Sequence, residues 1–204
     1  FLPLVGAVFI LTIRGDDDIV ARNTRFVAFW TTGINFLLSL YLWFNFDTST
    51  ADFQFVEKFE WMPILGLSYH MGVDGISMLF VLLTTLLTPI CVLASWRSIQ
   101  DRVKEYMISF LFMETLMVGM FCALDLMVFY IFFEGVLIPM FIIIGVWGGT
   151  RRVYSAFKLF LYTLAGSVLM LLAMFAMYVD AGTTDITLLM NHSFPAGLQT
   201  WLWL

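Results

Sequence analysis

A single carboxylate interrupts one of the most apolar stretches of the sequence. In FYIFFEGVLIPM, residues 129–140, Glu134 stands among apolar side chains, one glycine and one proline. A charge at the centre of a membrane helix costs roughly 2.5–3.5 kcal/mol on insertion scales, and such groups usually face polar interiors and mark ion paths. We therefore interpret Glu134 as a proton-carrying or ion-pairing residue. The alternative is a protonated glutamic acid that only bonds a neighbouring helix.

The backbone next to this glutamate is weakened. Pro139 has no N–H, so the carbonyl of Gly135, four residues earlier, loses its helical hydrogen bond. Gly135 also adjoins Glu134 and loosens the helix further. A freed carbonyl beside a carboxylate can hold water, although a packing kink explains Pro139 equally well when it is taken alone. The pattern favours a hydrated site.

Two further ionisable residues lie in apolar runs. Glu114 comes ten residues before Leu124, where the chain turns, and Glu134 comes ten residues after it. In an antiparallel pair of helices the two carboxylates reach similar depth, so Glu114 could relay a proton. Lys158 lies near the start of the following apolar run. It either reaches back to the membrane interface or joins the polar side of a hydrated path.

The composition places these residues in a membrane protein. Of the 204 residues, 61% are hydrophobic and 12% are charged, the net charge is −5, and the mean hydropathy is +0.93. Soluble domains carry about 25% charged residues. Apolar runs long enough to span a bilayer predict an all-α, polytopic transmembrane bundle. We expect helices near 1–13, 26–46, 76–96, 106–123, 126–147 and 156–178, with a seventh beginning near 198–204. The first is interpreted as a truncated helix and not as a signal peptide.

The basic residues predict how these helices are oriented. Nine of the ten Lys and Arg residues fall in the loops 14–25 and 97–105 and in or just after the turn 148–155, and only Lys58 falls in the long loop 47–75. The positive-inside rule makes the first three segments cytoplasmic and the loop 47–75 external. The basic residues form no patch of the kind that binds nucleic acid.

The expected external loop contains its own local structure. FQFVEKFEW, residues 53–61, places aromatic side chains at period two, which predicts a short strand or hairpin packed on the external surface. Asp74 precedes the apolar run that starts at Ile76, where an aspartate is a favourable N-cap.

No pattern in the sequence predicts a cofactor in this chain. His70 and His192 are 122 residues apart, and we interpret them as structural residues, not as metal or haem ligands. Cys91 and Cys122 stand alone in apolar runs and give no disulfide or metal-binding framework. Nucleotide-binding glycine motifs and zinc motifs are absent from the sequence.

Three stretches together resemble the antiporter-like membrane subunits of respiratory complex I. They are FYIFFEGVLIPMFIIIGVWGG (129–149), GVDGISMLFVLLT (72–84) and AFKLFLYT (156–163). The resemblance implies the first six or so of about fourteen helices, arranged as inverted repeats. In that family a glutamate on the fifth helix pairs with a lysine on the seventh in a proton half-channel. Glu134 matches the glutamate, Lys158 matches a lysine on the sixth helix of many members, and the seventh-helix lysine would lie beyond Leu204.

The resemblance also implies a function. It suggests a non-redox, proton-translocating subunit of NADH:quinone oxidoreductase, which couples electron transfer from NADH to quinone with proton pumping. Flavin and iron–sulfur clusters are then expected in partner subunits, and the partners are the other membrane and peripheral subunits and the lipid bilayer. The bacterial inner membrane is the expected location, with the mitochondrial inner membrane as the alternative. The alternative function is that of a subunit of a multi-subunit cation/proton antiporter, which shares the fold.

Overall fold

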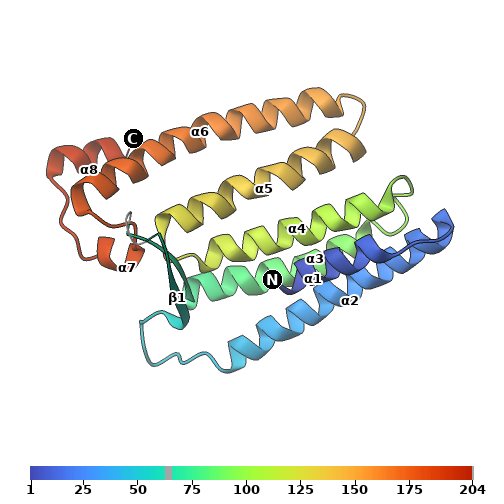
Figure 1. Cartoon of the computed structure of the whole chain (residues 1–204), viewed down its shortest axis with the longest axis horizontal. Coiled ribbons are helices and arrows are strands. Elements are labelled where there is room, and N and C mark those ends of the chain that lie inside the picture. Colours follow the sequence, from blue (N-terminus) through green and yellow to red (C-terminus); the bar gives the residue numbers. More distant parts are fainter. Residues whose placement is uncertain (63–65, 204) are drawn as a thin grey trace.

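The protein is a bundle of antiparallel helices with a small β-hairpin at one end (Figure 1). A computed structural model describes residues 1–62 and 66–203. Helices α1 to α6 follow one another back and forth, and the hairpin, α7 and α8 gather at the same end of the bundle (Figure 1). The elements are α1 (Leu2–Thr12), α2 (Asp17–Phe44), β1 (Gln54–Met62), β2 (Leu67–Val73), α3 (Gly75–Ala94), α4 (Val103–Cys122), α5 (Leu126–Trp147), α6 (Arg152–Ala181), α7 (Ile186–Leu189) and α8 (Ala196–Trp203).

Helices α2 to α6 are each long and apolar enough to cross a membrane. Each has at least 20 residues, which at 1.5 Å per residue spans about 30 Å, the thickness of the hydrocarbon layer. A helix satisfies its backbone hydrogen bonds internally, as a segment in lipid must. The chain is therefore an integral membrane protein built as a helical bundle, as the sequence predicts.

Helix α2 is longer than its apolar run. The sequence predicts a helix from residue 26, whereas α2 begins at Asp17. Asp17 and Asp18 lie in the first turn, where carboxylates interact favourably with the positive end of the helix dipole. Arg22 and Arg25, expected in a loop, therefore lie on the helix. The apolar run locates the membrane part of a helix but not a polar extension of it.

Helix α6 also extends beyond the predicted range of 156–178. It begins at Arg152 and ends at Ala181, where Gly182 adopts a φ of +72°. This left-handed conformation costs glycine little and is a common way to end a helix. Beyond it, the one-turn helix α7 was not predicted, and Asp185 caps it by accepting a hydrogen bond from the Thr187 N–H. Helix α8 begins at Ala196, close to the start predicted for a seventh helix.

The segment between α2 and α3 contains the predicted strand, β1, which pairs with a second strand, β2, to form a hairpin. β1 is antiparallel to β2, with Lys58 opposite His70 and Phe59 opposite Tyr69. β2 is mostly buried, but the aromatic side chains of β1 are not packed as expected: Phe59 is 65% exposed. Across residues 1–62 and 66–203, this hairpin is the only sheet and the other named elements are helices. After the hairpin, Asp74 caps α3 in a capping box with Ser77, which confirms the predicted N-cap.

At the end of the bundle opposite the hairpin, hydrogen bonds link the helix ends and the loops that connect the helices. Arg25 donates a 2.8 Å hydrogen bond to the carbonyl of Ile99, and Lys104 donates to the carbonyls of Leu11 and Ile13. The Trp147 indole N–H donates to the carbonyl of Asp101 at 2.8 Å. We call this the basic end and the opposite one the hairpin end. The basic segments that the sequence predicted on one side do lie together.

Candidate functional site

Small residues allow α4 and α5 to pack closely. A Cβ atom added to Gly119 would lie 2.6 Å from the Phe132 ring, and one added to Gly135 would lie 3.1 Å from Leu116. Close approach at small residues is typical of membrane helices. These contacts also set the register, because residue 119 faces 132 and residue 116 faces 135. Glu114 therefore lies opposite residue 137, three residues or about 4.5 Å further along α5 than Glu134.

Glu134 carries a buried oxygen that has no partner among the described residues. Its Oε1 atom makes no hydrogen bond to any of them. An unsatisfied buried polar atom costs about 1–3 kcal/mol and calls for an explanation. One turn earlier on α5, the Tyr130 side chain lies close enough to interact with Glu134 and with Ser167 of α6. The glutamate is thus placed at the contact between α5 and α6.

One edge of this site is not covered by the described residues. Ile131 and Ile138, three residues before and four residues after Glu134, are 46% and 57% exposed. At 100° per residue, both positions lie within about 60° of Glu134 around the helix. Glu134 therefore borders an open stripe of α5.

Glu114 is held by a residue that the sequence analysis did not single out. It is 1% exposed, and its Oε1 accepts a 2.8 Å hydrogen bond from Asn35 Nδ2 on α2. Its second oxygen, Oε2, is buried without a partner among the described residues. The only sequence signal for Asn35 is that of an amide in the apolar stretch GINFLL, residues 33–38.

Lys158 is not brought to the glutamates. It is exposed on α6, and among the described residues it makes no hydrogen bond or ion pair. Phe141 of α5 packs against Phe157 and Phe160 at ring distances of 5.2 and 5.6 Å. This contact puts Lys158 at the level of residue 141, seven residues or about 10 Å from Glu134 along α5. A proton passing between the two would need water or another side chain.

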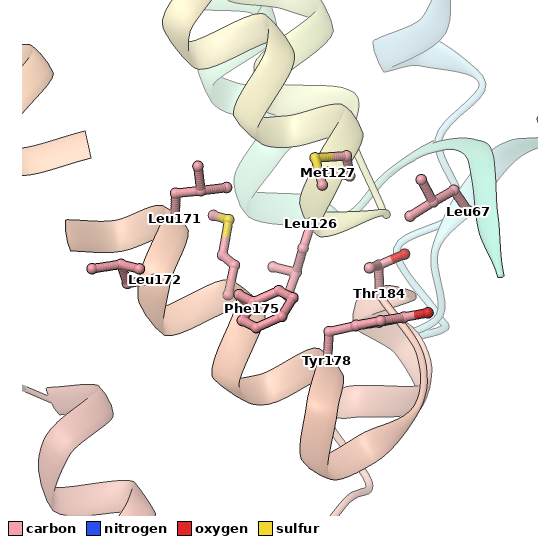
Figure 2. Close-up of a pocket in the computed structure, with 9 residues that line it drawn as sticks. Leu67, Leu126, Met127, Leu171, Leu172, Phe175, Tyr178 and Thr184 are labelled. Atoms are coloured by element: carbon pink, nitrogen blue, oxygen red, sulfur yellow. The ribbon is translucent and has the colours of Figure 1, made fainter. Parts of the chain in front are cut away.

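An apolar cavity of about 380 Å³ lies between α5 and α6 at the hairpin end. Figure 2 shows side chains from α5, α6 and the hairpin around it, with Thr184 and the Tyr178 hydroxyl near one edge. Leu126, Leu172 and Phe175 are among the apolar side chains that line it. Water chains need polar partners, which this lining scarcely offers. The cavity is therefore a poor candidate for a proton path.

A second cavity, of about 340 Å³, lies beneath the hairpin and is more polar. At the hairpin its lining includes Glu57 and Tyr69. Within the bundle it includes Asn35 and Thr115, which is the neighbour of Glu114 in α4. Asn35 lies nine residues, about 13 Å, from the end of α2 at Phe44. This cavity therefore reaches the residue that holds Glu114.

Asp185 organises a polar cluster at the hairpin end. Its Oδ2 accepts a 2.7 Å hydrogen bond from Lys58 and lies 3.1 Å from Nδ1 of His70. Burial alone would raise the pKa of Asp185, but the hydrogen bonds from Lys58 and Thr187 outweigh it and hold the pKa at about 2. Sequence reasoning missed this cluster because its members lie in separate segments. Within residues 1–62 and 66–203, no three His, Cys, Asp or Glu side chains are grouped as a metal site.

Two family models together match nearly the whole chain. Residues 21–124 match the model described as NADH-ubiquinone oxidoreductase chain 4, amino terminus. The chain belongs to this family. Residues 123–204, which include Glu134 and Lys158, match a second model, described as NADH:quinone oxidoreductase/Mrp antiporter, TM.

Relatives in the chain 4 family are similar over nearly all of the chain. NADH-quinone oxidoreductase subunit M of Rhodobacter capsulatus is 55% identical over 196 residues, which cover 96% of this chain and 38% of that protein. NADH-ubiquinone oxidoreductase chain 4 of Marchantia polymorpha is 47% identical over 204 residues, which cover 100% of this chain and 41% of that protein. The chain thus spans about two fifths of the length of these relatives.

Solved structures contain the same fold. A chain of respiratory complex I from Thermus thermophilus with bound NADH superposes with a TM-score of 0.83 at 28% identity, covering 99% of this chain and 40% of that chain. The Mrp complex from Dietzia sp. DQ12-45-1b gives a TM-score of 0.77 at 21% identity, covering 99% of this chain and 22% of that chain. The second likeness is one of fold alone.

Proposed function

We propose that this chain forms the amino-terminal helices of a proton-translocating membrane subunit of NADH:quinone oxidoreductase. Its membership of the chain 4 family supports this assignment. In this role the chain carries no redox centre and couples electron transfer from NADH to quinone with proton pumping. Partner subunits hold the flavin and iron–sulfur clusters. The complex lies in a bacterial inner membrane or in the mitochondrial inner membrane.

The unpartnered Oε1 of Glu134 is the observation that supports a proton-carrying site most strongly. An oxygen of a carboxylate that is buried without a donor among the described residues can bind a proton or pair with an incoming ammonium group. Pro139 removes one backbone hydrogen bond from the same helix, and the open stripe beside Glu134 leaves room for a basic partner. Glu114, about 4.5 Å away in depth, relays the proton, and Lys158 serves as a further relay through water.

Glu134→Gln tests this proposal in the assembled full-length complex. Glutamine keeps the shape of the side chain and removes its ionisation, so NADH-driven proton pumping in membrane vesicles should fall strongly. NADH oxidation by the peripheral part of the complex with an artificial acceptor should persist. Glu105→Gln is the matched control, because Glu105 is an exposed glutamate at the basic end of α4. Normal pumping by Glu134→Gln would refute the proposal.

The second candidate function is that of a subunit of a cation/proton antiporter. Two observations favour this second function. The second family model names the Mrp antiporter in its description, and the Mrp complex shares the fold of this chain. Purification of the native assembly separates the two functions. If flavin and iron–sulfur absorbance co-purifies with the chain, the oxidoreductase is supported. If this absorbance is absent and the purified assembly exchanges cations for protons, the antiporter is supported.

A further inference from the structure

The contact between α2 and α4 includes one oriented hydrogen bond to a buried carboxyl group. Asn35 Nδ2 donates to Glu114 Oε1 at 2.8 Å, while Glu114 Oε2 has no partner among the described residues. Glu114 is 1% exposed, so water reaches it poorly. The carboxyl group is therefore held through one oxygen, and the other oxygen is left free.

This arrangement suits a group that gains and loses a proton without changing its position. The amide nitrogen of asparagine can only donate. Oε1 accepts that hydrogen bond when the carboxyl group is ionised, and it still accepts as a carbonyl oxygen when the proton sits on Oε2. The hydrogen bond from Asn35 thus persists in both protonation states, and proton exchange is confined to Oε2.

Asn35 also lies at a boundary within the bundle. It lines the cavity of about 340 Å³ beneath the hairpin, together with Thr115. On its other side it bonds a carboxyl group that is closed off from solvent. A side chain at this boundary can fix the orientation of Glu114 while it contacts the cavity itself.

We propose that Asn35 is a positioning residue for proton exchange at Glu114. By holding Oε1, it aims Oε2 at the interior of the bundle and prevents the carboxyl group from rotating. The inference rests on the proposed function, because it requires that Glu114 exchanges protons during pumping.

The test compares two substitutions of Asn35 in the assembled full-length complex. Asn35→Leu keeps the approximate size and removes the donor, whereas Asn35→Gln keeps an amide donor. The measurement is the rate of NADH-driven proton pumping in membrane vesicles, normalised to the amount of assembled complex. Asn35→Leu should lower the pumping rate by about three- to tenfold, the equivalent of one lost hydrogen bond, and Asn35→Gln should recover part of it.

Ser39→Ala is the matched control. Ser39 lies one turn further along α2, is 3% exposed, and makes a 2.8 Å hydrogen bond with Thr85 of α3. Ser39→Ala also removes one 2.8 Å hydrogen bond between packed helices, but Ser39 makes no hydrogen bond with Glu114 among the described residues. Pumping should be unchanged in Ser39→Ala. A loss equal to that of Asn35→Leu would mean that packing alone is responsible, and the inference would be wrong.

A double-mutant cycle separates positioning from general stability. In a Glu114→Gln background the proton-exchanging group is absent, so adding Asn35→Leu should cause no further loss of pumping. Additive losses would overturn the inference, because a structural contribution of Asn35 would persist in that background. If Asn35→Leu prevents assembly, the smaller Asn35→Ala is used in the same cycle, with the same two outcomes.

The same variants distinguish the inference from the proposed function. Normal pumping by Glu114→Gln would remove Glu114 from the proton path, and the relay role assigned to it would fail. Impaired pumping by Glu114→Gln with normal pumping by Asn35→Leu would leave that role intact and refute only the positioning role of Asn35.

Discussion

Asp185 and Lys58 form a 2.7 Å ion pair that joins the loop after α6 to the β-hairpin. They are 127 positions apart in the chain. The carboxylate of Asp185 is 6% exposed and also contacts His70 of β2, so a single side chain ties both strands to the last membrane helix. Nearby, the Thr184 hydroxyl donates a 2.6 Å hydrogen bond to Asp125, the residue that caps α5.

Asp185→Asn should loosen the hairpin. The substitution keeps the shape of the side chain but removes the charge that Lys58 and His70 contact. Amide hydrogens of β1 and β2 should exchange several-fold faster with solvent in hydrogen-exchange mass spectrometry at neutral pH. Asp180→Asn is the control, because Asp180 pairs with His192, which lies in neither strand, and both side chains are about one third exposed. Equal effects of the two substitutions would contradict the role given to Asp185.

Asp185 should also make the hairpin sensitive to acid. Its pKa is lowered from 3.8 to about 2 in the folded protein, so it binds a proton more readily when the hairpin is detached. Its stabilising contribution is therefore complete above about pH 4 and is lost as the pH falls toward 2. The protection of the β1 and β2 amide hydrogens against exchange, corrected for the intrinsic pH dependence of exchange, should decline as the pH falls over this range. In Asp185→Asn this decline should be absent.

The two glutamates of the membrane helices should differ in importance. We expect Glu114→Gln to impair proton pumping less than Glu134→Gln. Glu134 lies beside Gly135, whose carbonyl loses its helical hydrogen bond because Pro139, four residues after that glycine, has no N–H. Glu114 lies in an uninterrupted stretch of α4 and already has a donor in Asn35. The measurement is the pumping rate of each assembled complex in vesicles. The reverse order would show that the local backbone of α5 matters less than the contact between α2 and α4.

The basic end should face the cytoplasm or its mitochondrial equivalent, the matrix. Ser98 and Ser49 are exposed near the basic end and the hairpin end, respectively. Single cysteines at these positions, with Cys91 and Cys122 replaced by serine, should react with an impermeant thiol reagent from opposite sides of the membrane. Ser98→Cys should be labelled from the cytoplasmic or matrix side. Labelling of both from one side would contradict the orientation.

Close packing of α4 and α5 should depend on Gly119. In Gly119→Ala the added Cβ would lie 2.6 Å from the Phe132 ring, so the helices must separate or the ring must move. Overpacking of this kind costs about 1–3 kcal/mol, so we expect a lower melting temperature of the purified protein. Gly166→Ala in α6 is the control, because nothing lies within 4 Å of its added Cβ. A melting temperature unchanged in Gly119→Ala would contradict the packing argument.

The sequence by itself determined the membrane helices of this protein. The apolar run between Asp125 and Gly148 admits no other membrane structure, because every backbone polar group in lipid must be satisfied within the helix. The sequence also assigned the basic segments to one side of the membrane, through the positive-inside rule. It also singled out Glu134 and Glu114 as ionisable residues in lipid, and their roles in proton transfer stay predictions.

Only the tertiary structure decided which polar residues meet. Asn35 and Glu114 are 79 positions apart, and their contact depends on how α2 and α4 are rotated about their axes. Hydropathy reports that a segment is buried in the membrane but not which face meets which neighbour. The contacts of Asp185 could not be predicted from hydropathy for the same reason. The start of α2 at Asp17 was missed because the first turns of this helix are polar and carry no apolar run.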